Sequence, residues 1–148
     1  MGLELKITND IKLAMLAKNR DKLEVCRSIK AAIILSKTER GTDEISDKKG
    51  IDILQKLLKQ RQYSEKIFLE QGRQDLANNE RIQANIISLY LPNPFSIDEL
   101  ESLVDSIMLD NNINSMSDMG KLISETLKFS QGRATGKSIS EIVKKKLS

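Results

Sequence analysis

The stretch Gly132-Arg-Ala-Thr-Gly-Lys-Ser138 decides how this chain is interpreted, because its glycines and lysine resemble a phosphate-binding loop. Such a loop needs a glycine, four residues and then Gly-Lys-Ser/Thr, all following a β-strand. The first glycine would have to stand where the chain has Gln131, and residues 119–129 have the spacing of a helix. We therefore predict a joint between two short helices, in which Gly132 closes the first at positive φ and Gly136 forms a second flexible corner.

Apolar residues recur at spacings of three and four on both sides of this joint, and no stretch alternates with period two for long. This pattern predicts an all-α fold. The expected helices cover about residues 3–18, 22–37, 48–71, 76–90, 97–110, 117–131 and 138–147. Two capping boxes, Ser96 with Glu99 and Ser138 with Glu141, are expected to start the fifth and seventh of these helices.

The two prolines of the chain, Pro92 and Pro94, stand together and prevent a helix from continuing. They predict a boundary between an N-terminal helical domain, residues 1–92, and a C-terminal domain, residues 96–148. The first should hold about four helices, one of them roughly 35 Å long at 1.5 Å per residue. The second should be a compact domain of three helices.

The long third helix has two distinct sides. On its apolar side, Arg61 and Glu65 stand four residues apart, and we predict that they pair with each other at the helix interface. The opposite side mixes cations with acids, and we predict a solvated face laced with ion pairs in preference to a dedicated binding surface. Its residues are Asp52, Lys56, Lys59, Lys66, Glu70 and Arg73.

Composition narrows the possible chemistry. The 148 residues include no histidine, which removes the commonest acid/base group at neutral pH and the commonest zinc ligand. Cys26 is the single cysteine, so no intramolecular disulfide can form, and its neighbours Val25 and Ile29 predict a buried thiol. We expect no catalytic residue, no cofactor and no metal site.

Targeting signals are not apparent in the sequence. Glu4, Lys6 and Asn9 interrupt the apolar run that a signal peptide would need, and no stretch approaches eighteen apolar residues. We therefore expect a cytoplasmic protein without a membrane partner.

Five ordered motifs together resemble the GatB/YqeY family over nearly the whole chain. They are Leu58-Lys-Gln-Arg61, Gly72-Arg-Gln-Asp-Leu-Ala77, Tyr90-Leu-Pro92, Met119-Gly-Lys121 and Gly132-Arg-Ala-Thr-Gly136. The resemblance implies an all-helical protein whose C-terminal part is similar to the tail domain of the B subunit of glutamine-dependent tRNA amidotransferase. The chain departs from the family pattern at Ser124, Lys128 and Thr135, where a glycine, a proline and an acid are expected.

The resemblance implies that the C-terminal part holds tRNA, since that tail helps to hold tRNA while other domains perform the chemistry. Net charge is +3 overall, but it is +4 over residues 1–96, −5 over residues 97–116 and +4 over residues 117–148. Cations in the last segment suit phosphate, and backbone N–H groups near Ser138 add a helix N-terminus. The predicted nucleic-acid-binding residues are Lys121, Lys128, Arg133, Lys137, Lys144 and Lys145.

Three functions remain open at this stage. The first is a non-catalytic tRNA-binding module associated with amidotransferase subunits or an aminoacyl-tRNA synthetase. The second is a carbon–nitrogen ligase with glutamine as amide donor, acting within a larger complex, although the sequence offers neither a phosphate loop nor a nucleophile beside a base. The third is a protein-interaction adaptor that docks a partner on the acidic stretch, residues 98–110, or on the long third helix.

Overall fold

The computed structural model describes residues 2–148, which form helices and turns and contain no strand. The all-α prediction is confirmed. The elements are α1 (Leu3–Leu16), α2 (Arg20–Arg40), α3 (Asp47–Glu70), α4 (Gln74–Ser88), α5 (Ile97–Asp110), the short 3-10 helix η1 (Met116–Asp118), α6 (Met119–Ser130) and α7 (Gly136–Leu147). They divide between two compact units, Met1–Leu91 and Pro92–Ser148, so the division falls at the double-proline segment.

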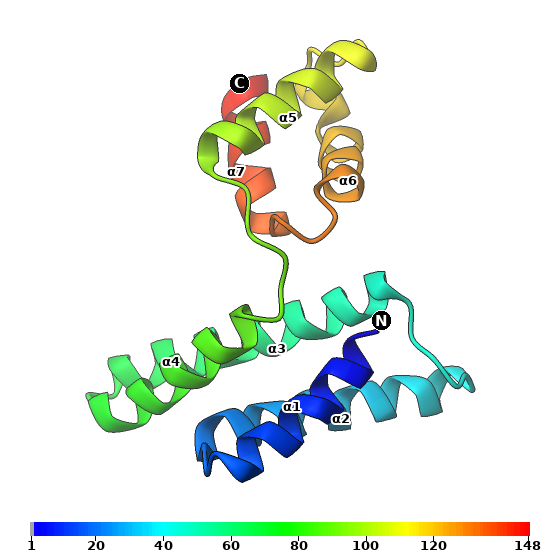
Figure 1. Ribbon diagram of the computed structural model, residues 1–148. Coiled ribbons are helices and arrows are strands. Elements are labelled where there is room, and N and C mark those ends of the chain that lie inside the picture. Colours follow the sequence, from blue (N-terminus) through cyan, green and yellow to red (C-terminus); the bar gives the residue numbers. More distant parts are fainter. Residues whose placement is uncertain (1) are drawn as a thin grey trace. The chain divides into compact units, whose positions relative to one another are not determined.

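The N-terminal unit consists of α1 to α4 (Figure 1). Helix α1 packs along α2, α3 packs along α4, and α2 contacts both α3 and α4. Because the chain has few aromatic residues, its core is aliphatic. The buried core residues are Ile7, Val25, Cys26, Ile29, Ile33, Ile53, Leu54 and Ile87.

Helices α3 and α4 are joined by two ion pairs that the sequence did not predict. Arg61 Nη1 lies 3.1 Å from Glu80 Oε2, and Arg81 Nε lies 3.0 Å from Glu65 Oε2. The predicted pair between Arg61 and Glu65 is therefore wrong. Spacing along one helix identifies only the neighbours on that helix, whereas the packing of α4 against α3 brings closer partners from nineteen and sixteen residues away.

Tyr90 closes the N-terminal unit just before the double-proline segment. Its hydroxyl donates a hydrogen bond to an Asp10 carboxylate oxygen and lies 3.3 Å from the Sγ atom of Cys26, which is fully buried as predicted. The ammonium groups of Lys6 and Lys22 lie 5.3 and 5.9 Å from the centre of its ring, within range of a cation–π attraction. These contacts tie the end of the unit to α1 and α2.

We predict that the Tyr90 hydroxyl makes stability sensitive to high pH. Burial, with the adjacent Asp10 and Cys26, raises the pKa of Tyr90 above its ordinary value. Above about pH 10 an unfolded tyrosine loses its proton while the folded one keeps it, so the free energy of unfolding should fall as pH rises. Urea unfolding between pH 8 and 11 should show a steeper fall for the wild type than for Tyr90→Phe. Parallel curves would contradict this.

The C-terminal unit consists of α5, α6 and α7, and each of these helices contacts the other two (Figure 1). Its buried residues recur at helical spacing, for example Ile139, Val143 and Leu147 along α7. The full set is Leu100, Val104, Ile107, Ile113, Leu122, Ile139, Val143 and Leu147. This unit therefore has a hydrophobic core of its own.

The caps of the C-terminal helices agree only partly with the sequence patterns. The Ser96 and Glu99 capping box is confirmed, with both hydrogen bonds at 3.1 Å. The second predicted box is wrong, because α7 begins at Gly136 and its cap is Thr135, whose hydroxyl accepts a hydrogen bond from the Ser138 N–H at 3.2 Å. Gln131, at a φ of 50°, closes α6 in place of Gly132, which follows it at a φ of 83°. Gly136 is the first residue of α7 and forms no second corner.

We predict that the Thr135 cap stabilises the C-terminal unit. Thr135→Ala should lower its free energy of unfolding by about 1 kcal/mol, because a helix N–H loses its acceptor. Thr135→Asp should retain the wild-type stability, because a carboxylate accepts the same bond and is favoured at a helix N-terminus. Urea unfolding followed by circular dichroism measures both. Equal losses in the two variants would show that the side-chain cap is unimportant.

No helix within residues 2–148 is both long and apolar enough to cross a membrane.

Candidate nucleic-acid interface

Charge in the C-terminal unit is divided between its helices. Helix α5 carries only acids, namely Asp98, Glu99, Glu101, Asp105 and Asp110. All the cations of the unit follow η1, on α6, on α7 and in the turn between them. The unit thus has an acidic helix and two helices that carry its positive charge, and any polyanion would meet α6 and α7 with less repulsion than α5.

On α6, the two predicted lysines point away from the core. Leu122, Thr126 and Ser130 are buried, while Lys121 and Lys128 are exposed and, at 100° per residue, share the opposite face. Lys128 Nζ lies 3.6 Å from a carboxylate oxygen of Glu125. An exposed pair at this separation is weak, so the ammonium group remains available to a stronger anion.

On α7, the three predicted lysines are exposed as well. Lys137, Lys144 and Lys145 lie on the side opposite the buried stripe of the helix, and Glu141 stands between them. Lys144 and Lys145 are in the last turn, where cations also complement the helix dipole. We call the five exposed lysines of α6 and α7 the outward lysines. They are Lys121, Lys128, Lys137, Lys144 and Lys145.

Arg133, the sixth predicted residue, is held by contacts within its own unit. Its Nε donates to the Asn93 carbonyl oxygen at 2.8 Å, its guanidinium lies 4.0 Å from the centre of the Phe95 ring, and one nitrogen lies 3.9 Å from Glu99. The Phe95 N–H also donates to the Arg133 carbonyl oxygen at 2.8 Å. Arg133 thereby fastens the double-proline segment to the turn between α6 and α7.

Two further side chains belong to this arrangement. A hydrogen bond from the Ser96 backbone lowers the pKa of the Glu99 carboxyl, and the Arg133 charge adds to the effect, so Glu99 is a stable anion beside the guanidinium. Lys146, by contrast with its neighbours on α7, turns toward α5, and its Nζ lies 2.8 Å from Asp105 Oδ1. Sequence spacing cannot identify these engaged cations, because their partners come from other parts of the fold.

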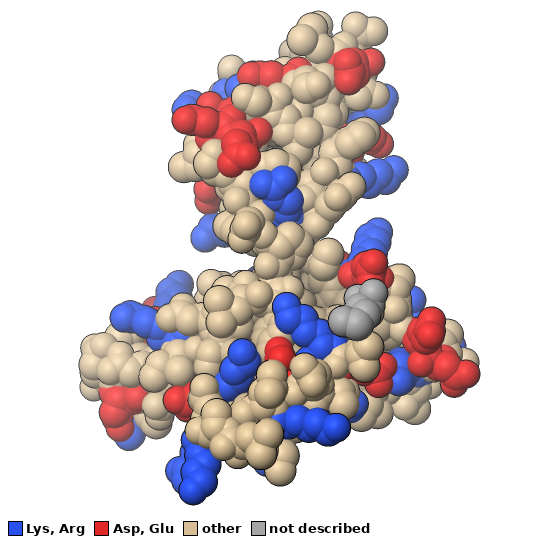
Figure 2. Space-filling model, in the orientation of Figure 1, with Lys and Arg blue, Asp and Glu red and all other residues tan. Residues whose placement is uncertain are grey.

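The outward lysines form two groups, one on each helix. Helical spacing aligns the lysines within each group, while Figure 2 shows, on the face drawn, blue surfaces of this unit separated by tan and red ones. A ligand that touched both groups would have to contact two helices of the unit. A helical nucleic acid carries many phosphates at regular spacing and can contact several lysines at once.

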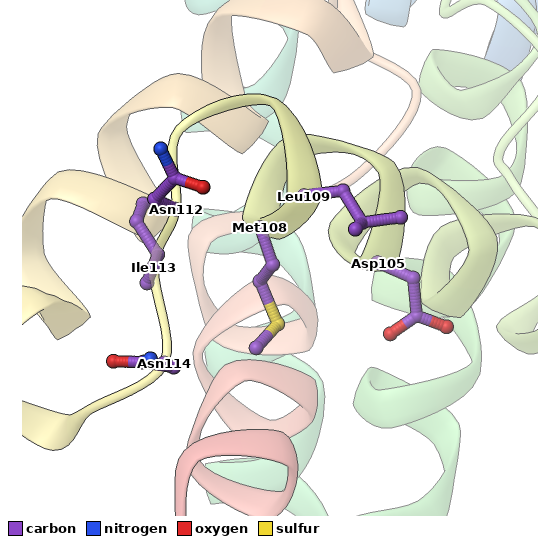
Figure 3. Close-up of a pocket in the computed structure, with 6 residues that line it drawn as sticks. All are labelled: Asp105, Met108, Leu109, Asn112, Ile113 and Asn114. Atoms are coloured by element: carbon purple, nitrogen blue, oxygen red, sulfur yellow. The ribbon is translucent and has the colours of Figure 1, made fainter.

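A shallow hollow of about 430 Å³ lies at the end of α5 (Figure 3). Asp105, Met108 and Leu109 line it from α5, and residues 112–114 line it from the following turn. The lining contains one carboxylate and no cation, so it does not suit phosphate. Leu109 is 79% exposed beside it, and the hollow is better suited to an apolar side chain of another protein.

The N-terminal unit carries a second cationic surface along α3. The sequence predicted a face laced with ion pairs there, but among the ion pairs of the described residues none involves Lys56, Lys59 or Lys66. Of the residues predicted to form that face, Arg73 does pair, with Asp75 at 3.4 Å. The three lysines do not, because Glu65, the acid of α3 that pairs, lies on the other side of the helix. The sequence interpretation also missed Tyr63, which stands between these lysines and whose helical spacing from them was the available signal.

Within residues 2–148, no group of three or more histidine, cysteine, aspartate or glutamate side chains is arranged to hold a metal ion.

Comparison with known proteins identifies a family and a relative. Residues 4–147 match the model of a family described as YqeY-like protein. A segment of 86 residues is 36% identical to altered inheritance of mitochondria protein 41, mitochondrial, from Eremothecium gossypii. That segment is 57% of this chain and 46% of the relative, so the chain spans less than half of that protein's length.

Proposed function

Because the chain belongs to the YqeY-like protein family, we propose that it acts as a non-catalytic module that binds tRNA and serves tRNA-dependent amidation. The observation that carries this proposal is the set of outward lysines, exposed on α6 and α7 in a unit whose acids are concentrated on α5. The likeness of its motifs to the tail of the amidotransferase B subunit supports tRNA as the polyanion. Arg133 has a positioning role in this proposal, since it holds the unit together behind the lysines.

The expected recognition is electrostatic. Five lysine–phosphate contacts on a duplex give a slope of about −4 to −5 for the logarithm of the association constant against that of salt concentration. The A-form minor groove and backbone would be recognised by shape, because their phosphates recur at regular spacing. The acids of α5 orient the complex, since the RNA must approach from the side of α6 and α7.

A titration of labelled tRNA with the full chain tests the proposal. Binding should be detectable at 50 mM salt and should weaken by about 500-fold at 200 mM, as the expected slope requires. Absence of binding at 50 mM, or binding that salt leaves unchanged, would count against tRNA as the ligand. A partner of the amidotransferase or synthetase class would then have to be recognised by protein contacts.

A protein-interaction adaptor is the second candidate, and the hollow at the end of α5 favours it. Leu109 and Met108 offer apolar contact there, and the exposed acids Asp98 and Asp105 lie on the same helix. A basic amphipathic segment of an amidotransferase subunit or an aminoacyl-tRNA synthetase has matching chemistry. Recovery of the same partner before and after nuclease treatment would favour the adaptor.

Independent ligase activity is the weakest of the three functions. Amide formation from glutamine needs a nucleophile that reaches the substrate, and Cys26 is fully buried against Tyr90. We therefore propose no reaction step for this chain. Release of ammonia from glutamine by the purified protein would overturn that assignment.

We keep the cytoplasm as the proposed compartment. The name of the relative places that protein in mitochondria, and cell fractionation distinguishes the two compartments.

A further inference from the structure

One face of α3 combines unpaired cations with an exposed aromatic ring. Its residues recur at intervals of four and three and lie opposite the buried positions Ile53 and Leu54. We call this face the α3 stripe. It consists of Asp52, Lys56, Lys59, Tyr63, Lys66 and Glu70, all of them exposed.

The lysines of the α3 stripe are free to meet a ligand. Lys56, Lys59 and Lys66 take part in none of the ion pairs or hydrogen bonds found among residues 2–148. The first and last of them stand ten positions apart, or about 15 Å along the helix. The two acids lie beyond them, one at each end of the stripe, so the middle of the stripe is positive throughout.

Tyr63 lies in this positive middle, with its side chain 65% exposed. Lys59 precedes it by four residues and Lys66 follows it by three, so both ammonium groups lie on the same face as the ring. No position of the stripe is aliphatic. The stripe therefore offers no apolar area for a lipid surface or for a helix packed through leucines, but it offers one flat ring for stacking.

A shallow hollow of about 360 Å³ adjoins the tyrosine. Gln60, Arg61, Tyr63 and Ser64 line it, so an amide, a guanidinium and a hydroxyl face the space beside the ring. Arg61 is fixed in place by its ion pair with Glu80 at 3.1 Å. Amide and hydroxyl groups both donate and accept hydrogen bonds, as the edge of a nucleobase requires.

We propose that the α3 stripe binds an unpaired nucleotide of single-stranded RNA. The base stacks on Tyr63 with its edge toward Gln60 and Ser64, and the flanking phosphates contact Lys56, Lys59 and Lys66. Single-stranded nucleic acid is held in this way by aromatic rings set among cations, whereas a duplex keeps its bases stacked and would meet only the lysines. The proposal concerns a different unit, and a different form of RNA, from the outward lysines.

The probe is a labelled twelve-nucleotide oligouridine, titrated with the full chain at 50 mM salt. Tyr63→Ala should weaken its binding by about tenfold, because one stacked base is lost, and Tyr63→Phe should bind within about twofold of the wild type. Joint replacement of the three stripe lysines by glutamine should make the salt slope shallower by about 2. The matched control replaces Lys12, Lys18 and Arg27, which are exposed on or beside α1 and α2, and should change affinity much less.

Several results would overturn the proposal. The first is that Tyr63→Ala binds oligouridine as tightly as the wild type, and the second is that Tyr63→Phe weakens binding as much as Tyr63→Ala. The third is that polyglutamate or a matched RNA duplex displaces the labelled oligouridine as effectively as unlabelled oligouridine does. Glutamine in place of the outward lysines should leave oligouridine binding unchanged while it weakens tRNA binding. Failure of the tRNA proposal is thus distinguished from failure of this one.

Discussion

Glutamine in place of all five outward lysines should weaken tRNA binding by at least about 100-fold at 50 mM salt. Each lysine that neutralises a phosphate releases a counterion, and the gain per contact is several-fold at this ionic strength. The five side chains are exposed and lie on the faces of α6 and α7 opposite the core, so the variant should fold. Fluorescence anisotropy with labelled tRNA gives the affinity, and circular dichroism verifies the helices.

A matched control separates position from net charge. Glutamine at five exposed cations of the N-terminal unit produces the same change in charge away from α6, α7 and the α3 stripe. The control positions are Lys12, Lys18, Arg20, Arg27 and Arg40. This variant should lose less than about tenfold in affinity. Equal losses of affinity in the two variants would mean that tRNA binding depends on the net charge of the protein and not on a specific surface of α6 and α7.

Leu122→Ala should remove a large part of the stability of the C-terminal unit. Leu122 is fully buried in that core, and a leucine truncated at such a site costs about 2 to 5 kcal/mol. A unit of 57 residues, Pro92–Ser148, has only about 3 to 9 kcal/mol of stability to lose. Leu127→Ala is the matched control on the same helix, because Leu127 is 42% exposed, and it should cost less than about 1 kcal/mol.

Tyrosine fluorescence and circular dichroism together distinguish the unfolding of the two units. Both tyrosines, Tyr63 and Tyr90, belong to the N-terminal unit, and there is no tryptophan. Tyrosine fluorescence therefore follows that unit alone during urea unfolding, whereas circular dichroism follows both. Leu122→Ala should move an early part of the circular dichroism transition and leave the fluorescence transition in place. Equal shifts in both signals would show that the two units do not unfold separately.

The sequence predicted those features of the fold that depend on local chemistry. Apolar spacing gave the all-α class, and the Ser96 and Glu99 box fixed the start of α5. It erred where two patterns compete or where the partner comes from another helix. Thr135 and Ser138 are both residue types that cap helices, and in the structure Thr135 occupies the N-cap position of α7. Arg61 bonds to Glu80 instead of Glu65 because α4 lies along α3.

For the candidate site, the sequence identified the cations but not which of them bind other residues of the same unit. Lys146 on Asp105 and Arg133 on Asn93 and Phe95 depend on partners that only the folded unit brings near. Lys56, Lys59 and Lys66 were expected to pair with acids, yet exposed side chains on a helix gain little from such pairs. Tyr63 was missed although its spacing from Lys59 and Lys66 was available in the sequence, because spacing alone does not show that the ring is exposed.

The slope of tRNA affinity against salt concentration tests the central claim most directly. The logarithm of the association constant, measured from 50 to 300 mM salt, should fall more steeply for the wild type than for the variant with glutamine at the five outward lysines. The two slopes should differ by about 4 to 5, one counterion for each lysine lost. Identical slopes for the two proteins would contradict the claim that α6 and α7 carry the phosphate contacts.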